Sequence, residues 1–160
     1  MNWKILKLTK SRECYQKNNI VRKIYKNRCI QKMSNEINAL HILRKYKHFP
    51  KILNIDWANF SIDMSYVGDS IINKNLIELP NDILKQFDSI ENILKKNKIH
   101  HNDLALSHFM LKNDILYLID FEKVIIERDD TLFTQYNPSY IKNRYVVDIK
   151  NKLINKFIKK

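Results

Sequence analysis

Residues 99–122 read IHHNDLALSHFMLKNDILYLIDFE, and this stretch decides the fold. It holds two short apolar runs, Phe109–Leu111 and Ile115–Ile119, on either side of the polar turn Lys112–Asp114. Two strand-forming runs joined by a short polar turn are typical of a β-hairpin. We therefore predict a hairpin here, with the rest of the chain organised around it.

Three side chains that bind cations or phosphate flank the predicted hairpin. Asp103 and His108 precede its first strand, and Asp120 follows its second strand. The hairpin is expected to bring the three together at one edge, which predicts a metal and phosphate site. A single Asp on a loop is more often a solvated surface residue, but the ordered set of three favours the functional interpretation.

The order and spacing of these residues resemble the catalytic segment of the protein-kinase-like fold. That segment reads H-R-D-L-x-x-x-N and is followed by a hairpin and D-F-G. Here His101–Leu104 reads HNDL, with Asn in place of Arg, and Asp120–Glu122 reads DFE, with Glu in place of Gly. His108 stands at the position of the metal-binding Asn. The resemblance covers residues 20–148, most of the chain.

Within that fold, the segment is most similar to the lipopolysaccharide core heptose kinases, which act on sugars. Those kinases carry a His-Phe pair, as in His108–Phe109, and a second metal motif that Leu118–Asp120 resembles. In size, the chain also resembles the small RIO-type protein kinases and the kinase subunit of the tRNA threonylcarbamoylation complex.

The resemblance implies an α+β class and a minimal two-lobed protein-kinase-like fold. It predicts a β-rich N-lobe with one helix at residues 1–67, a hinge at 68–71 and a truncated helical C-lobe at 72–160. A chain of 160 residues is long enough for one such domain.

The N-terminal part contains the lysine that this fold requires. Strands are predicted at residues 3–8, 13–16 and 20–25. Ile20–Lys23 is similar to the kinase V-A-I-K motif, which implies that Lys23 holds the nucleotide phosphates. Lys26 is a rival, but its odd separation from Lys23 places the two on opposite faces of a strand.

The turn between the first two strands, Thr9–Ser11, contains no glycine. Kinases cover the phosphates with a glycine-rich loop, because glycine lets the backbone approach phosphate oxygens closely. We therefore expect the side chains of Lys10 and Ser11 to join Lys23 in holding the phosphates, with a weaker grip.

Residues 33–47 predict an amphipathic helix with Ser34 as its N-cap. By the resemblance, Glu36 on this helix pairs with Lys23. A lysine that holds phosphates needs a carboxylate to fix it in place. The alternative for Glu36 is a solvated position on the helix surface.

Further strands are predicted at residues 51–57 and 60–67. The segment Met64–Ile71 reads MSYVGDSI, contains the single glycine of the chain and resembles the kinase hinge, whose backbone binds adenine. The resemblance implies that Met64 and Tyr66 border the nucleotide, with Ile52 also beside the adenine. The alternative is a core strand that ends in a turn.

Two more helices are predicted, at residues 82–96 and 145–158. The first has a continuous apolar stripe and is expected to be part of the core. In the second, Asp148 resembles the buried kinase aspartate that braces the catalytic loop. Between them, the polar residues 129–139 lack the A-P-E anchor of a kinase activation segment.

The matched residues imply an ATP-dependent phosphotransferase. Asp103 accepts the proton of the acceptor hydroxyl, Asp120 binds the Mg²⁺ or Mn²⁺ that bridges the phosphates, and His108 is a second metal ligand. Because imidazole suits manganese better than magnesium, we expect a manganese preference. The expected acceptor is a hydroxyl of a lipopolysaccharide-type glycan or of a protein Ser or Thr.

Three alternatives remain. A pseudokinase would bind nucleotide or act as a scaffold without turnover, which the missing glycines favour. A metal hydrolase centre would use the His and Asp residues at 100, 101, 103 and 108, although these lack helical H-x-x-x-H spacing. A nucleic-acid-binding module rests on the net charge alone.

The composition limits the partners and the compartment. The net charge is +12, from 29 Lys and Arg against 17 Asp and Glu. This charge favours anionic partners such as nucleotides, although the abundance of Lys, Asn and Ile indicates a compositional contribution. Cys14 and Cys29 have no metal-ligand spacing, which fits a reducing, cytoplasmic setting. No membrane span is predicted.

Overall fold

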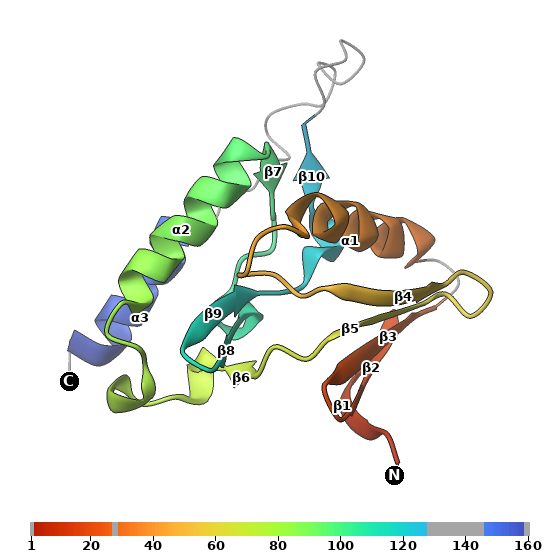
Figure 1. Ribbon diagram of the computed structural model, residues 1–160, viewed down its shortest axis with the longest axis horizontal. Helices are drawn as coiled ribbons and strands as arrows, with labels where there is room; N and C mark the ends of the chain where they lie inside the picture. Colours follow the sequence, from red (N-terminus) through yellow and green to blue (C-terminus); the bar gives the residue numbers. More distant parts are fainter. Residues whose placement is uncertain (1, 27–28, 128–145, 159–160) are drawn as a thin grey trace.

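The computed structural model describes residues 2–26, 29–127 and 146–158. The described chain forms two parts, a sheet-rich part near the N-terminus and a mixed part that holds the predicted hairpin and two helices (Figure 1). This arrangement confirms the α+β class.

The N-terminal part is a five-stranded antiparallel sheet with the order β1-β2-β3-β5-β4. Its strands are β1 (Lys4–Leu8), β2 (Arg12–Lys17), β3 (Ile20–Tyr25), β4 (Ile52–Asp56) and β5 (Ser61–Ser65). Every one of these strands lies within two residues of its predicted bounds. The helix α1 (Ile30–Leu43) lies above β4 in Figure 1 and contacts both this sheet and the turn Phe121–Lys123 of the second part.

The bounds predicted for α1 were wrong at both ends, because the helix runs from Ile30 to Leu43 and not over residues 33–47. The helix begins at Ile30, so Ser34 lies inside it, and Cys29 occupies the N-cap position without a side-chain hydrogen bond that caps the helix. The first turn is stabilised by packing instead, because Met33 is completely buried. Burial of an apolar side chain outweighs the preference of Ser for a helix cap.

The second part contains the predicted hairpin. Strands β8 (Phe109–Lys112) and β9 (Ile115–Leu118) pair antiparallel, and β6 (Asp69–Ser70) adds a third strand beside β8. Strand β7 (Ile99–His100), which precedes the hairpin in sequence, pairs with β10 (Ile125–Ile126), which follows it, in a separate two-stranded sheet. The predicted hairpin is therefore confirmed, with Lys112 paired to Ile115 next to the turn.

Helices α2 (Ile83–Lys96) and α3 (Val146–Ile158) pack against each other on the far side of the hairpin (Figure 1). Short 3-10 turns complete the described chain at Ile71–Asn73, Leu76–Glu78, Leu106–His108 and Phe121–Lys123. None of the helices that the structure describes is long and apolar enough to cross a membrane.

One apolar core runs through both parts. Phe87 of α2 stacks on Phe109 of β8, with ring centroids 4.6 Å apart. Phe121 meets Phe49 at 5.9 Å in an edge-to-face contact, and α1 packs on the turn that Phe121 begins. This contact fixes the position of α1 relative to the residues that follow β9.

Gly68 marks the passage from the sheet to the hairpin. Its φ is +91°, and a Cβ at this position would lie 2.0 Å from the carbonyl oxygen of Leu111. Both the backbone angle and the close approach to β8 therefore require glycine. The tight crossing agrees with a bend at residue 68, and the lobe boundaries themselves remain a prediction.

The prediction that Asp148 braces the catalytic loop was wrong. Asp148 is exposed on α3, because Val146, Ile149 and Leu153 form the buried face of that helix. The polar segment 129–139 lies outside the described residues.

Candidate active site

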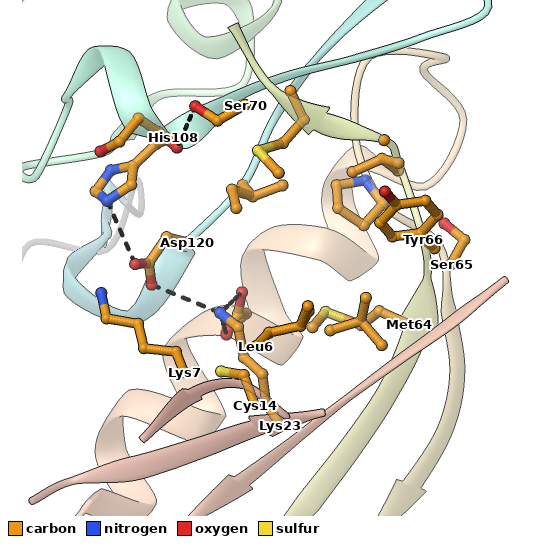
Figure 2. Close-up of a pocket in the computed structure, with 18 of the residues that line it drawn as sticks. Leu6, Lys7, Cys14, Lys23, Met64, Ser65, Tyr66, Ser70, His108 and Asp120 are labelled. Atoms are coloured by element: carbon orange, nitrogen blue, oxygen red, sulfur yellow. Dashed lines mark hydrogen bonds and ion pairs between the residues drawn. The ribbon is translucent and has the colours of Figure 1, made fainter. Parts of the chain in front are cut away.

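A cavity of about 470 Å³ opens between the sheet and the hairpin (Figure 2). Its size falls in the range of about 300–1,000 Å³ that small-molecule sites occupy. The residues that line it come mainly from the first three strands, the segment 64–70 and the hairpin with its two ends, and Glu36, Pro50 and Asn73 complete the lining.

An ion pair between Lys23 and Glu36 lies on one wall of the cavity. The Lys23 Nζ donates to both Glu36 carboxylate oxygens at 2.8 Å, and Tyr25 donates its hydroxyl hydrogen to the same carboxylate. Both ionic side chains are buried. Burial alone would lower the pKa of Lys23, but the charges of Glu36 and Asp120 outweigh it and raise this pKa. The predicted pairing of Lys23 with Glu36 is present.

Asp120 lies where β9 ends and points into the cavity (Figure 2). The Lys23 Nζ is 3.5 Å from its Oδ1, and the His108 Nε2 is 3.5 Å from its Oδ2. Although burial raises the pKa of Asp120, Lys23 and Arg12 together hold this pKa well below its usual value. Asp120 is therefore a carboxylate at neutral pH, and the backbone adopts φ +73° at this residue.

Arg12, at the start of β2, is the residue that sequence reasoning missed. Its Nη1 and Nη2 donate to the two Asp120 oxygens at 2.7 and 2.8 Å, and Nη1 also donates to Glu122. Arg12 is only 9% exposed. Glu122 gave the one sequence signal, because an acid in place of the expected Gly, next to Asp120, requires a cation nearby.

The predicted metal ligands do not fit a divalent ion as they are arranged. Both oxygens of Asp120 already accept hydrogen bonds from Arg12, and His108 is the one predicted partner left for a metal. Among residues 2–26, 29–127 and 146–158, no three His, Cys, Asp or Glu side chains come together as a metal-binding group. The alternative of a histidine-rich hydrolase centre gains no support for the same reason.

His101 is a structural residue beneath the site. Its Nε2 donates to the Ile119 carbonyl oxygen at 2.9 Å, and its ring meets Phe121 edge-to-face at 4.9 Å. Burial lowers the pKa of His101 to about 4, so the ring is neutral at physiological pH. It thereby ties the loop that carries Asp103 to the strand that precedes Asp120.

Asp103 lies on the solvent side of the site. Its side chain is 39% exposed and forms an ion pair with the Lys123 Nζ at 3.0 Å. Within the described chain it does not line the cavity, whereas His108 on the same loop does. A group in this position is open to an acceptor molecule that arrives from solvent.

Met64 and Tyr66 both line the cavity, as predicted, together with Val21 and Pro50. Ile52, which was also expected there, is not part of the lining that the described residues form. The backbone N–H of Tyr66 donates to the Asn19 carbonyl oxygen at 2.8 Å. The Tyr66 carbonyl oxygen accepts a hydrogen bond from the Lys112 Nζ at 2.9 Å.

Lys10 and Ser11 are not brought to the cavity. Thr9 Oγ1 accepts hydrogen bonds from the backbone N–H groups of Ser11 and Arg12, which closes a tight turn at the end of β1. Leu6 and Lys7 of β1 line the cavity in their place (Figure 2). The turn Thr9–Ser11 therefore does not line the cavity, and the Lys7 side chain of β1 does.

The comparisons with known proteins support the kinase-like fold. No known protein-family model matches the chain. The solved structure of the kinase PK-1 of Cydia pomonella granulovirus aligns with a TM-score of 0.58 and 22% identity, over 79% of this chain and 54% of that one. The arrangement is therefore a minimal two-lobed protein-kinase-like fold.

Two archaeal proteins are similar in sequence, each described as a probable bifunctional tRNA threonylcarbamoyladenosine biosynthesis protein. The one from Methanocaldococcus jannaschii is 40% identical over 72 residues, and the one from Methanococcus vannielii is 34% identical over 88 residues. The matches cover 45% and 54% of this chain but span only 13% and 16% of those relatives.

Proposed function

We propose that this chain is an ATP-dependent phosphotransferase that transfers the γ-phosphate to an acceptor hydroxyl. The observation that carries the proposal is the buried Lys23–Glu36 ion pair on the cavity wall, with Lys23 also directed at Asp120. In a kinase-like fold this pair positions the lysine that contacts the nucleotide phosphates. We propose the lobe division given by the sequence, at residues 1–67, 68–71 and 72–160.

The cavity separates apolar from charged surface in the way a nucleotide requires. Val21, Pro50 and Met64 supply apolar walls for a base, and Lys23 and Arg12 supply positive charge for phosphates. Phosphoryl transfer depends on positioning and on charge neutralisation more than on covalent chemistry. These residues therefore meet the main demands of the reaction.

In the proposed transfer step, Asp103 accepts the proton of the acceptor hydroxyl. The acceptor oxygen forms a bond to the γ-phosphorus, and the bond from that phosphorus to the β–γ bridging oxygen breaks. ADP leaves with the electron pair of the broken bond, and the hydroxyl proton passes to the Asp103 carboxylate. Lys123, 3.0 Å from this carboxylate, limits its motion and faces the same solvent side.

Magnesium and manganese are part of what the kinase resemblance implies. In kinases such ions bridge the phosphates and neutralise their charge. With Arg12 on both oxygens of Asp120, no step is assigned to a metal here. The manganese preference expected through His108 stays a prediction, and a His108→Asn variant with an unchanged metal profile would contradict it.

Protein Ser or Thr hydroxyls are the first acceptors to test, because the similar fold is that of a viral kinase. Lipopolysaccharide-type glycans are the second, because of the His-Phe pair at His108–Phe109. The half-exposed Asp103 is accessible to either class.

A pseudokinase is the second candidate, and the contact of Arg12 with Asp120 favours it. A carboxylate that accepts two hydrogen bonds from a buried arginine is poorly placed to exchange ligands during turnover. In that case the cavity binds nucleotide without releasing ADP.

Turnover of γ-labelled ATP separates the two candidates. ADP release and label transfer are measured with a panel of protein and glycan acceptors, for the wild type, Asp103→Asn and the exposed hairpin residue Asp114→Asn as a matched control. Loss of a catalytic base lowers turnover by about 10²–10⁴-fold. We expect this loss in Asp103→Asn alone, with ATP affinity unchanged. ATP binding without any turnover in the wild type would establish the pseudokinase.

A further inference from the structure

One departure from the kinase pattern contacts a buried arginine at the cavity. Glu122 stands where the D-F-G motif has glycine, and Arg12 extends from the start of β2. Arg12 donates one hydrogen bond to Glu122 and two to Asp120. Arg12 therefore bridges Glu122, which replaces the motif glycine, and Asp120 of the same motif.

The surrounding charges form one compact buried cluster. Lys23 lies 2.8 Å from Glu36, 3.5 Å from Asp120 and 3.8 Å from Glu122. Each of these residues and Arg12 is at most 9% exposed. Three carboxylates face two cations, so withdrawal of Arg12 would leave buried acids without a counter-charge, which is strongly unfavourable. Arg12 is therefore expected to stay in place when a ligand enters.

Arg12 retains donors for such a ligand. A guanidinium carries five N–H donors in a planar fork. The described contacts engage both donors of Nη1 and one donor of Nη2, so that Nε–H and the second N–H of Nη2 have no partner within residues 2–26, 29–127 and 146–158. Arg12 also lines the cavity, beside Lys23 and Lys7. A guanidinium fork matches the geometry of phosphate oxygens.

We propose that Arg12 is a resident cation of the nucleotide-phosphate site, and that it allows a nucleoside triphosphate to bind without a divalent metal. Arg12 contacts the phosphates together with Lys23, while its two hydrogen bonds to Asp120 keep it at the cavity and Glu122 balances its charge. The proposal rests on the nucleotide site of the proposed function, but it does not depend on turnover.

Equilibrium binding of ATP with EDTA or with excess Mg²⁺ tests this proposal. The variants are Glu122→Ala, the double variant Arg12→Ala/Glu122→Ala and Arg22→Ala. The double variant removes both partners of the contact, which avoids an unpaired buried acid at Glu122. Arg22 is a matched control, because it makes a bidentate contact with Asp63 at 2.6 and 2.7 Å outside the cavity lining.

We expect the wild type to bind ATP in EDTA within about threefold of its affinity in Mg²⁺. Loss of one charge-assisted contact is expected to weaken binding by about tenfold or more, so the double variant should lose at least that much in EDTA. Glu122→Ala should bind ATP at least as tightly as the wild type, because one negative charge is gone, and Arg22→Ala should be unchanged. Circular dichroism and urea unfolding confirm that each variant is folded.

Each opposite result overturns the proposal. Wild-type binding that requires Mg²⁺ would refute the metal-free site while the proposed phosphotransferase stands. Equal binding in EDTA by Glu122→Ala and the double variant would show that Arg12 does not contact the phosphates. Absence of ATP binding to the wild type in both solutions would refute the nucleotide site, and the proposed function with it.

Discussion

Two buried ion pairs border the cavity and meet at Asp120. Lys23 and Glu36 are 13 residues apart and belong to a motif, whereas Arg12 and Glu122 are 110 residues apart and belong to none. The first pair was predicted from the sequence and the second was not. A motif reveals side chains that share a known task, but a compensating pair becomes visible only when the strands are placed in space.

The largest expected effect comes from breaking the first pair. Lys23→Met leaves Glu36 and Asp120 buried with less positive charge, so we expect a loss of about 3–5 kcal/mol in the free energy of unfolding. Urea unfolding of the wild type and the variant measures this loss. The Arg22–Asp63 pair is the control, because its arginine is 38% exposed, and Arg22→Ala should cost clearly less than Lys23→Met. Equal losses would contradict the difference between buried and exposed pairs.

The pH dependence of stability tests the burial of His101, on the loop that carries Asp103. His101 has a folded pKa of about 4, against an unfolded value near 6.5. Between these values the unfolded chain binds a proton that the folded chain does not, so stability falls as the pH decreases. The expected loss is about 2 kcal/mol from pH 7 to pH 5. Most carboxylates titrate below this window.

Urea unfolding at pH 7 and pH 5 measures the contribution of His101 when the wild type is compared with His101→Gln. The variant should lose less stability than the wild type over this range. His41→Gln is the matched control, because His41 is exposed on α1, so the variant should keep the pH dependence of the wild type. An identical pH dependence in the wild type and His101→Gln would contradict a neutral buried His101.

The smallest expected effect comes from the exposed contact between Lys123 and Asp103. Both side chains are more than a third exposed, so Lys123→Ala should change the free energy of unfolding by less than about 1 kcal/mol. Urea unfolding should show this small change while the turnover number shifts, because the proposed base loses its neighbour. A large loss of stability would show that this contact is structural.

Local patterns in the sequence predicted most of the fold. The strand bounds and the hairpin followed from apolar runs and polar turns, which are local properties. The start of α1 did not, because Met33 packs in the core and overrides the cap preference of Ser34. Asp148 failed for a related reason, since the buried face of α3 is set by Val146, Ile149 and Leu153.

The motifs placed all but one of their candidate site residues at the cavity, the exception being Asp103, which does not line it. Lys23, Glu36, Met64, Tyr66, His108 and Asp120 all lie at the cavity. Lys10 and Ser11 do not, because the direction of a turn without glycine depends on hydrogen bonds such as those of Thr9. Arg12 escaped prediction because its partners are more than 100 residues away in sequence.

The most direct test of the central claim is thermal unfolding with and without saturating ATP, for the wild type and Lys23→Met. A ligand at about a hundred times its Kd stabilises the folded state by about 2.7 kcal/mol. We expect an increase of this size in the wild type, whether or not Mg²⁺ is present, and little or no increase in Lys23→Met relative to its own unliganded state. An unchanged wild-type unfolding temperature, or an equal increase in the variant, would contradict a nucleotide site built around Lys23.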